Sequence, residues 1–384
     1  MKTGLSSLMA AVALAVASFA QGQTSWNPKT NAEILWQTNV GLGYSMTVPY
    51  GDNLIVTGHK DEQDTIYCIS AATGEQQWRF DYPQPLGDLY FQGGTTGSVT
   101  IDGDRLYHVA REGELFCLNA NTGEKIWDIN LKDTYTKKPE WGFTGSPIPY
   151  GDNLLIAAGE AGTLISKKDG SIIWKSKDVE HGYSTPYLFE LDGRDLVIFS
   201  SKQHYICVDP KTGEEIWRHK WMTRYSVNAS TPIVTDNHVF ISSGYDKGAV
   251  LLSWDGKSQP ERVWQSREMR NQMNPSLLLG DHLYGIDGNE RKDRTGLKCI
   301  KFLTGEVTWS VDDLGHGAVI EKDNHLIVIS EAGKLQIAPV SPTEFKPVLE
   351  KQIYDGKTWT LPVLSNGVLY CRNDAGEIAA VNLK

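Results

Sequence analysis

Eleven side chains of types that bind ligands lie outside the repeated parts of this 384-residue sequence, in the segments that link one group of apolar runs to the next. Most are aromatic or histidine, and the rest can donate or accept hydrogen bonds. Aromatic rings supply apolar surface and sparse polar groups supply orientation, the mixture that a concave site for a planar or sugar-like ligand needs. The candidates are Tyr44, Trp141, Phe143, His181, Tyr183, Tyr225, Asn228, Arg270, Asn274, His316 and Trp359.

Trp141 is the strongest single candidate, because the nearby Gly142 and Gly145 leave one face of its ring free. Arg270 is the charged residue of this set whose role in ligand binding we would test first. The set contains no pair of carboxylates, and the chain has no His-Glu-x-x-His, Cys-x-x-Cys or Cys-x-x-Cys-His sequence. We therefore predict ligand binding at these positions, with no catalytic residue and no metal site.

A repeated phrase supplies the elements that position these side chains. Residues 115–127 read Leu-Phe-Cys-Leu-Asn-Ala-Asn-Thr-Gly-Glu-Lys-Ile-Trp, and the same parts return at the same offsets along the chain. Short runs rich in Val, Ile, Leu, Tyr and Phe, separated by Gly and Asp turns, predict antiparallel strands joined by hairpins. Gly123 recurs because such turns need a residue at positive φ. A four-stranded unit of this size cannot bury both faces alone, so the units must stack.

The spacing of the repeat tryptophans predicts the number of units. Seven of them are separated by 42 to 49 residues. A divergent unit covers residues 318–353, with Leu349 where its tryptophan would fall. The C-terminal segment has only three strands, and residues 34–37 form a fourth strand that has no unit of its own. The sequence therefore predicts an all-β fold, an eight-bladed β-propeller of four-stranded antiparallel blades, with the ring closed by the N-terminal strand. The seven tryptophans are Trp36, Trp78, Trp127, Trp174, Trp217, Trp264 and Trp309.

With its Asp-x-x-Thr-Gly-Glu-x-x-Trp phrases, the chain resembles the pyrroloquinoline-quinone (PQQ) repeat family over nearly its whole length. Residues 209–217 carry the phrase in full. The chain is most similar to the small, single-propeller exported members, the BamB-like type, rather than to the large quinoprotein alcohol dehydrogenases. The resemblance implies a propeller, but the recurring residues build the blade and do not specify an activity.

The eleven candidates share one place in such a propeller. The links from the outer strand of one blade to the inner strand of the next converge on one mouth of the central channel, which is the usual ligand mouth. The same aromatic residues can instead plug the channel and pack neighbouring blades. His181 and His316 can be satisfied by backbone groups rather than act as bases. Both interpretations remain open from the sequence.

The first residues read as an export signal. A basic end, a short apolar core and a small-residue cleavage site near Ala20 predict a signal peptide over residues 1–20, a lead-in over 21–33 and the propeller over 34–384. No stretch has the length of a membrane-spanning helix. We expect a periplasmic or extracellular protein. No cysteine follows the apolar core, so we expect no lipid anchor, and in this the chain departs from BamB.

The net charge and the positions of the cysteines limit which partners and which thiol chemistry we expect. The formal net charge is −10, and no basic run offsets it, so we expect no nucleic-acid partner. Four cysteines occupy one strand position in different blades, too far apart to bridge, and a fifth lies on the second strand of the last blade. We predict five buried free thiols and a monomer. The cysteines are Cys68, Cys117, Cys207, Cys299 and Cys371.

Three functions fit these observations. The first is a non-catalytic binding or scaffolding protein of the cell envelope, whose partner is an unidentified protein or small molecule. The second is a quinone-dependent oxidoreductase; PQQ is a possible cofactor, but the chain lacks the adjacent cysteine pair and the metal-ligand set that the resemblance implies for such dehydrogenases. The third is a carbohydrate-binding or carbohydrate-active propeller, whose catalytic form would need two facing carboxylates. We expect the first function and no cofactor.

Overall fold

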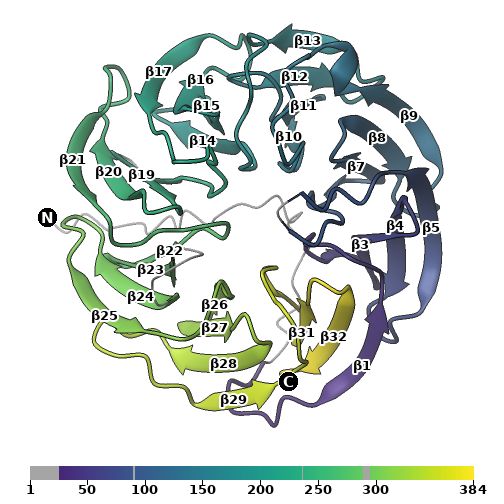
Figure 1. Ribbon diagram of the computed structural model, residues 1–384, viewed down its shortest axis with the longest axis vertical. Coiled ribbons are helices and arrows are strands. Elements are labelled where there is room, and N and C mark those ends of the chain that lie inside the picture. The colour runs from purple at the N-terminus through teal and green to yellow at the C-terminus, as the bar shows by residue number, and fades with distance from the viewer. Residues whose placement is uncertain (1–25, 90, 236, 289–294) are drawn as a thin grey trace, which may run out of the picture.

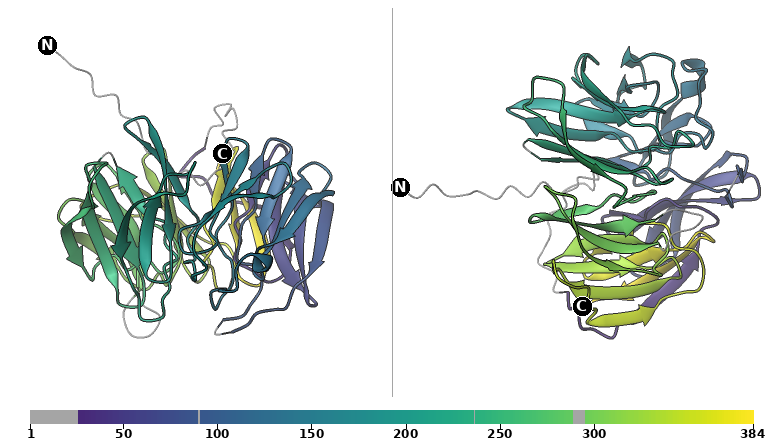
Figure 2. Two further views of the ribbon diagram at one scale, coloured as in Figure 1. Left: turned by 90° about the horizontal axis from the view of Figure 1, so that it is seen from above. Right: turned by 60° about the vertical axis from the view of Figure 1, so that its left-hand side comes forward.

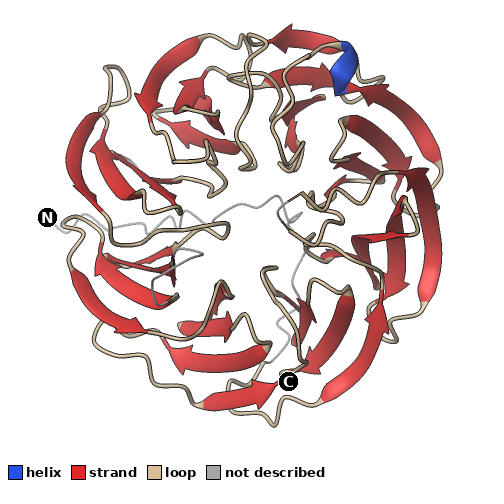
Figure 3. Cartoon of the chain, viewed as in Figure 1, coloured by secondary structure: helices blue, strands red, loops and turns tan. Residues whose placement is uncertain are grey.

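Eight antiparallel sheets of four strands each form a closed ring around a central channel (Figure 1). The computed structural model describes residues 26–89, 91–235, 237–288 and 295–384. Within these ranges the single helical element is the short 3-10 helix η1 (Leu131–Asp133), as Figure 3 shows. The predicted all-β, eight-bladed propeller is confirmed. The signal peptide over residues 1–20 lies outside the described residues and stays a prediction.

The strands of each blade follow one another from the channel outward. Blades 1 to 4 comprise β2 (Val48–Tyr50), β3 (Asn53–Lys60), β4 (Gln63–Ser70), β5 (Gln76–Pro83); β6 (Thr100–Asp102), β7 (Arg105–Val109), β8 (Glu114–Asn119), β9 (Lys125–Asn130); β10 (Ile148–Tyr150), β11 (Asn153–Ile156), β12 (Thr163–Ser166), β13 (Ile172–Lys175); and β14 (Tyr187–Leu191), β15 (Arg194–Ser200), β16 (His204–Val208), β17 (Glu215–Lys220). Blades 5 to 8 comprise β18 (Ile233–Thr235), β19 (His238–Ser243), β20 (Gly248–Ser253), β21 (Glu261–Ser266); β22 (Leu277–Leu279), β23 (His282–Asp287), β24 (Gly296–Lys301), β25 (Val307–Val311); β26 (Ala318–Lys322), β27 (His325–Ile329), β28 (Lys334–Pro339), β29 (Leu349–Gln352); and β30 (Val363–Ser365), β31 (Val368–Arg372), β32 (Glu377–Asn382), β1 (Ile34–Asn39).

The first strand of the chain closes the ring, as predicted. Strand β1 pairs antiparallel with β32 and places Trp36 opposite Ala380 (Figure 1). The side views in Figure 2 show the strands running between the two faces of the ring. Residues 26–33 precede this strand and lie against blade 7, where Trp26 donates from Nε1 to Asp323 at 2.6 Å. The N-terminal segment, residues 26–39, is therefore held by blades 7 and 8, the last two blades of the chain.

In five blades the turn glycine between the third and fourth strands lies under a tryptophan of the preceding blade; these glycines are Gly74, Gly123, Gly170, Gly213 and Gly305. Gly123 has φ of 75°, and a Cβ there would lie 2.5 Å from the Trp78 ring. Gly74 meets Trp36 in the same way across the closing seam, where Trp36 Nε1 donates to the Ala71 carbonyl at 3.1 Å. The sequence predicted the positive φ of these turns. The tryptophan ring above each glycine adds a second reason for a residue without a Cβ. In blade 7, Leu349 stands opposite Ile337 in place of a tryptophan.

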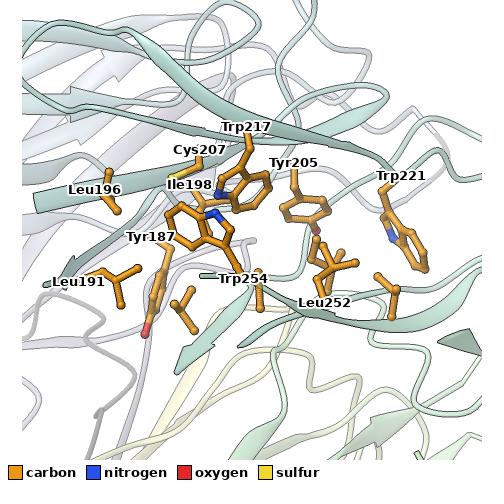
Figure 4. Close-up of a cluster of buried hydrophobic side chains, with 14 residues drawn as sticks. Tyr187, Leu191, Leu196, Ile198, Tyr205, Cys207, Trp217, Trp221, Leu252 and Trp254 are labelled. Atoms are coloured by element: carbon orange, nitrogen blue, oxygen red, sulfur yellow. The ribbon is translucent and has the colours of Figure 1, made fainter. Parts of the chain in front are cut away.

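The core lies in the seams between blades. Figure 4 shows the seam of blades 4 and 5, where Trp217 meets Trp254 edge-on with ring centroids 5.8 Å apart. Cys207 belongs to this cluster and stands opposite Trp217. All five cysteines are buried and free, as predicted. In the part of the chain that the structure describes, no helix has the length and apolar character needed to cross a bilayer.

Candidate functional site

A cavity of about 650 Å³ opens at one mouth of the channel, and all eight blades line it. The links that precede the inner strands carry the lining residues toward the axis (Figure 1). One lining residue for each blade, in order from blade 1, is Tyr44, Phe91, Trp141, Tyr183, Tyr225, Asn274, His316 and Trp359. The structure thus brings together seven of the eleven predicted residues, and Phe91 joins them.

Stacked rings build the wall where blades 8 and 1 meet. The rings of Tyr44 and Trp359 are nearly parallel, with an interplanar angle of 26°. Phe91 lies 5.8 Å from Tyr44, centroid to centroid, and His316 meets Trp359 edge-on at 6.2 Å. This wall lines the cavity with aromatic rings that contact one another.

A second aromatic wall runs from blade 3 to blade 5. Trp141 and Tyr183 have ring centroids 5.5 Å apart, and the Trp141 Nε1 donates to the Leu89 carbonyl at 3.1 Å. Tyr225 meets Tyr245 edge-on at 5.0 Å. Trp141 is therefore held in place, as a preformed binding surface requires.

Few ionisable groups line this mouth. Among the described lining residues, Glu140 is the single carboxylate and His316 the single histidine. Burial raises the pKa of the Tyr44 and Tyr183 hydroxyls well above the usual value, so both are neutral phenols at pH 7. A neutral phenol donates or accepts a hydrogen bond but does not act as a base. The lining suits binding better than proton transfer.

Asn274 ties three blades together at the mouth. Its Nδ2 donates to the Trp359 carbonyl at 2.9 Å and to the Gly317 carbonyl at 3.2 Å. The side chain therefore fixes the link of blade 6 against those of blades 7 and 8, and its Oδ1 is the atom left to meet a ligand.

Two predicted residues, Phe143 and His181, are buried behind the links rather than at the mouth: Phe143 packs in the seam of blades 2 and 3, and His181 pairs with Ser201 of blade 4. Each side chain is only 2% exposed, and their ring centroids are 4.7 Å apart. Gly142 turns the chain at φ of 76° and lies against the Arg111 carbonyl, which accepts from the Phe143 amide at 3.0 Å. His181 Nδ1 donates to the Gly182 carbonyl at 2.5 Å, and burial lowers its pKa to about 4. Neither residue lines the cavity, and both are buried among the residues that hold the links in place.

Asn228 and Arg270 have structural partners as well. The buried Asn228 donates from Nδ2 to the carbonyls of Ser201 and Trp221, at 2.9 and 2.8 Å. Arg270 makes a bidentate pair with Asp287, at 3.0 Å for each contact. Neither residue lines the cavity, so sequence position in a link does not by itself indicate which way a side chain points.

Comparison with known proteins identifies the family. A family model described as outer membrane protein assembly factor BamB matches residues 19–96 and 62–311. The chain belongs to the BamB family. It is 22% identical over 370 residues to BamB of Yersinia pestis, which covers 90% of this chain and 88% of that protein. The crystal structure of BamB from Moraxella catarrhalis matches with a TM-score of 0.67 at 16% identity, over 91% of this chain and 99% of that one.

The BamB-family chain also resembles quinoprotein dehydrogenases. It is 29% identical over 171 residues to the quinoprotein ethanol dehydrogenase of Pseudomonas aeruginosa, which covers 40% of this chain and 26% of that enzyme. The chain thus spans about a quarter of the length of the first curated relatives that it matches. A europium-containing methanol dehydrogenase superposes with a TM-score of 0.64 at 10% identity, over 92% of this chain and 87% of that one, which shows a shared fold.

The lining of the mouth does not fit a metal-bound quinone. Within the described ranges no group of three His, Cys, Asp or Glu side chains could hold a metal ion. At the mouth the side-chain oxygens that a hard cation prefers come from Glu140, Gln272 and Asn274, together with hydroxyls. The chain has no adjacent cysteines, and all five thiols lie in the blades. We therefore derive no step through a quinone, and the expectation of no cofactor stays a prediction.

Several lining residues were not among the predicted candidates, and Tyr245 is the most informative. It lies in the hairpin between β19 and β20, where Tyr245 and Asp246 both have positive φ, 54° and 59°. Two consecutive residues at positive φ make a type I′ turn, whose usual sequence signal is Asn-Gly. That signal is absent at Tyr245-Asp246. The hairpins between second and third strands open on the same face as the links. Including these hairpins among the candidate positions would have identified Tyr245.

Proposed function

We propose that this protein is a non-catalytic binding propeller of the cell envelope, whose mouth holds a segment of another protein. The relatives that match most of the chain are named outer membrane protein assembly factors, and the predicted signal peptide agrees with export. In this proposal the chain serves assembly as a scaffold, and its ring supplies a rigid surface rather than a reaction centre.

The aromatic lining of the mouth carries this proposal. All eight blades contribute to one cavity of about 650 Å³, and its rings pack against one another. Aromatic side chains dominate the energetics of protein interfaces, especially in concave pockets that exclude water. A partner segment with an apolar or aromatic side chain would bury it between Trp141 and Trp359. Glu140 and the hydroxyls of the wall would orient its backbone.

Photo-cross-linking tests the proposal in cells. A benzophenone amino acid placed at Met273, which lines the mouth, would form an adduct with a partner that enters the cavity. The matched control places it at Ile173, which is 51% exposed on the outer strand of blade 3. We expect one discrete adduct at the mouth, reduced by Trp141→Ala. Adducts at Ile173 alone, or at both positions equally, would contradict binding at the mouth.

Quinone-dependent oxidation is the second candidate, because the similarity to quinoprotein dehydrogenases favours it. Calorimetric titration with PQQ and Ca²⁺ separates the two functions. Saturable binding that Trp141→Ala abolishes would support the oxidoreductase and justify a screen of alcohols. Absence of binding to the folded protein would leave the scaffold as the proposed function.

A further inference from the structure

A second hollow lies beside the mouth, at the outer end of blade 5. It has a volume of about 640 Å³ and is lined by polar side chains, three of which are cationic. We call it the basic groove and define it by the residues Asp246, Lys247, Arg262, Gln265, Ser266 and Arg267. The chain as a whole carries more acidic than basic residues, so a concentration of cations here is unusual.

The strand register directs part of the basic groove toward the seam of blades 4 and 5. Gln265 stands opposite Val250, and Arg262 stands opposite Leu252. Opposed residues of an antiparallel pair point to the same face of the sheet. Val250 and Leu252 belong to the cluster around Trp217 (Figure 4), so Arg262 and Gln265 rim the outside of that seam.

The three cations of the basic groove form no ion pair with a carboxylate among the described residues. Asp246, which also lines the groove, contacts Arg270 at 3.5 Å instead. Arg262 donates to the neutral Gln265 amide at 3.3 Å. The Lys247 ammonium lies 4.3 Å from the Trp221 ring centroid. The positive charge of the groove is therefore not neutralised by salt bridges of its own.

The field of these cations reaches the neighbouring blade. Burial lowers the pKa of His219 on β17, and the charges of Lys247 and Arg262 lower it further. Burial also lowers the pKa of Lys247 itself. Like charges that converge on one hollow repel each other, and a bound anion would relieve that repulsion.

The basic groove and the mouth share a wall. The hairpin between β19 and β20 presents Tyr245 to the mouth and Lys247 to the groove. Consecutive Cα atoms are about 3.8 Å apart, so these two residues are within about 7.6 Å of each other. Two or three residues of extended chain, at about 3.3 Å each, are enough to cross that wall.

We propose that the basic groove binds an acidic segment of the same partner protein whose apolar part enters the mouth. This inference rests on the proposed function and names the chemistry of the partner: an extended segment in which Asp or Glu residues lie within a few positions of an apolar or aromatic residue. Its carboxylates pair with Lys247, Arg262 and Arg267 across the hairpin. Such pairs at the rim of an interface set specificity and the rate of association.

A peptide without aromatic residues tests the groove separately from the mouth. The probe is a fluorescein-labelled peptide of alternating Glu and Ser, and its control replaces each Glu with Gln. Binding to the whole mature protein is followed by fluorescence anisotropy at low and high salt. We expect the Glu peptide to bind at low salt and to weaken at high salt, because exposed charges are screened. Trp141→Ala should leave this binding unchanged, so failure here and failure of the mouth are distinguishable.

Two triple variants with the same change in charge assign the site. Lys247→Gln, Arg262→Gln and Arg267→Gln together should weaken peptide binding by about tenfold or more, as expected when several charge pairs are lost. The control is Lys125→Gln, Lys301→Gln and Lys322→Gln, three exposed lysines that each pair with a carboxylate elsewhere on the ring. Circular dichroism and thermal unfolding check that both triples fold.

Three results would overturn the inference. Equal loss of affinity in both triple variants would show a response to net charge alone. Absence of binding by the Glu peptide at low salt would remove the groove as a carboxylate site. The protein could also bind phosphatidylglycerol vesicles through the groove but bind neither phosphatidylcholine vesicles nor the Glu peptide. That result would assign the groove to a lipid surface instead.

Discussion

The ring centroids of Tyr44 and Trp359 lie 5.6 Å apart, although Tyr44 precedes the first blade and Trp359 precedes the inner strand of the last. The stack therefore exists only when blade 8 has closed against blade 1. The Thr360 hydroxyl donates to the Tyr44 carbonyl at 3.1 Å across the same seam. Closure of the ring and formation of the mouth are thus one event, which gives the mouth the rigidity that binding requires.

Tyr44 also gives a test of polar burial. Its hydroxyl is buried and has no hydrogen-bond partner among the described residues. Tyr44→Phe should therefore leave the free energy of unfolding unchanged or raise it by up to about 1 kcal/mol, since an unpartnered buried polar group is unfavourable. The matched control is Tyr205→Phe, because the Tyr205 hydroxyl donates to the Ser230 carbonyl at 2.8 Å. That variant should lose about 1 to 2 kcal/mol in urea unfolding. Equal losses would indicate that Tyr44 has a partner, such as a bound water.

Gly123, which lies under the Trp78 ring, and Gly103, which lies under no side chain, should respond differently to substitution by alanine. Gly123→Ala places a Cβ against the Trp78 ring and adds strain at positive φ, so we expect a loss of about 3 kcal/mol in the free energy of unfolding. Gly103 has φ of 64°, but no atom lies within 4 Å of the place that its Cβ would occupy, so Gly103→Ala should lose only about 1 kcal/mol. Urea unfolding of both variants measures the difference. Similar losses would mean that the seam yields to the added methyl group.

His181 predicts a dependence of stability on pH. Its pKa is about 4 in the folded protein, below the value of about 6.5 expected for an unfolded chain. Protons therefore bind the unfolded state first, and the stability that the neutral histidine maintains above pH 6.5 is lost as pH falls toward 4. Between pH 7 and pH 5 the native protein should lose about 2 kcal/mol more than the His181→Phe variant. Urea unfolding at both pH values tests this, and parallel losses would rule out His181 as the cause.

The buried thiols predict slow chemical modification. All five cysteines are buried and free, and burial raises the pKa of Cys68 and Cys117 to about 11. The thiolate is the reactive form, so little of it exists at pH 8. We expect Ellman's reagent to modify no thiol rapidly in the folded protein and all five in urea. Rapid modification of one thiol in the native state would identify a blade that opens locally.

The candidate site was only partly predictable, because its links are irregular. Strand residues alternate between faces, so burial in the blades follows from the pattern. The links have no such period: Trp141 faces the mouth, and Phe143, two residues later, turns into a seam after Gly142. Asn228 is of a type that suits a ligand, yet the carbonyls of Ser201 and Trp221 take both its donors. Neither outcome can be read from residue type.

What the sequence by itself determined is the ring: eight units, the closing strand, the seam tryptophans and the buried cysteines all follow from a repeated local pattern that each blade satisfies with its own residues. The tertiary structure decided which side chains meet. Tyr44 reaches Trp359 only because the closed ring brings the two ends of the chain together, and Lys247 joins Arg262 and Arg267 through the pairing of β20 with β21 in blade 5. Repetition specifies a blade locally, whereas a site shared between blades depends on how all of them pack together.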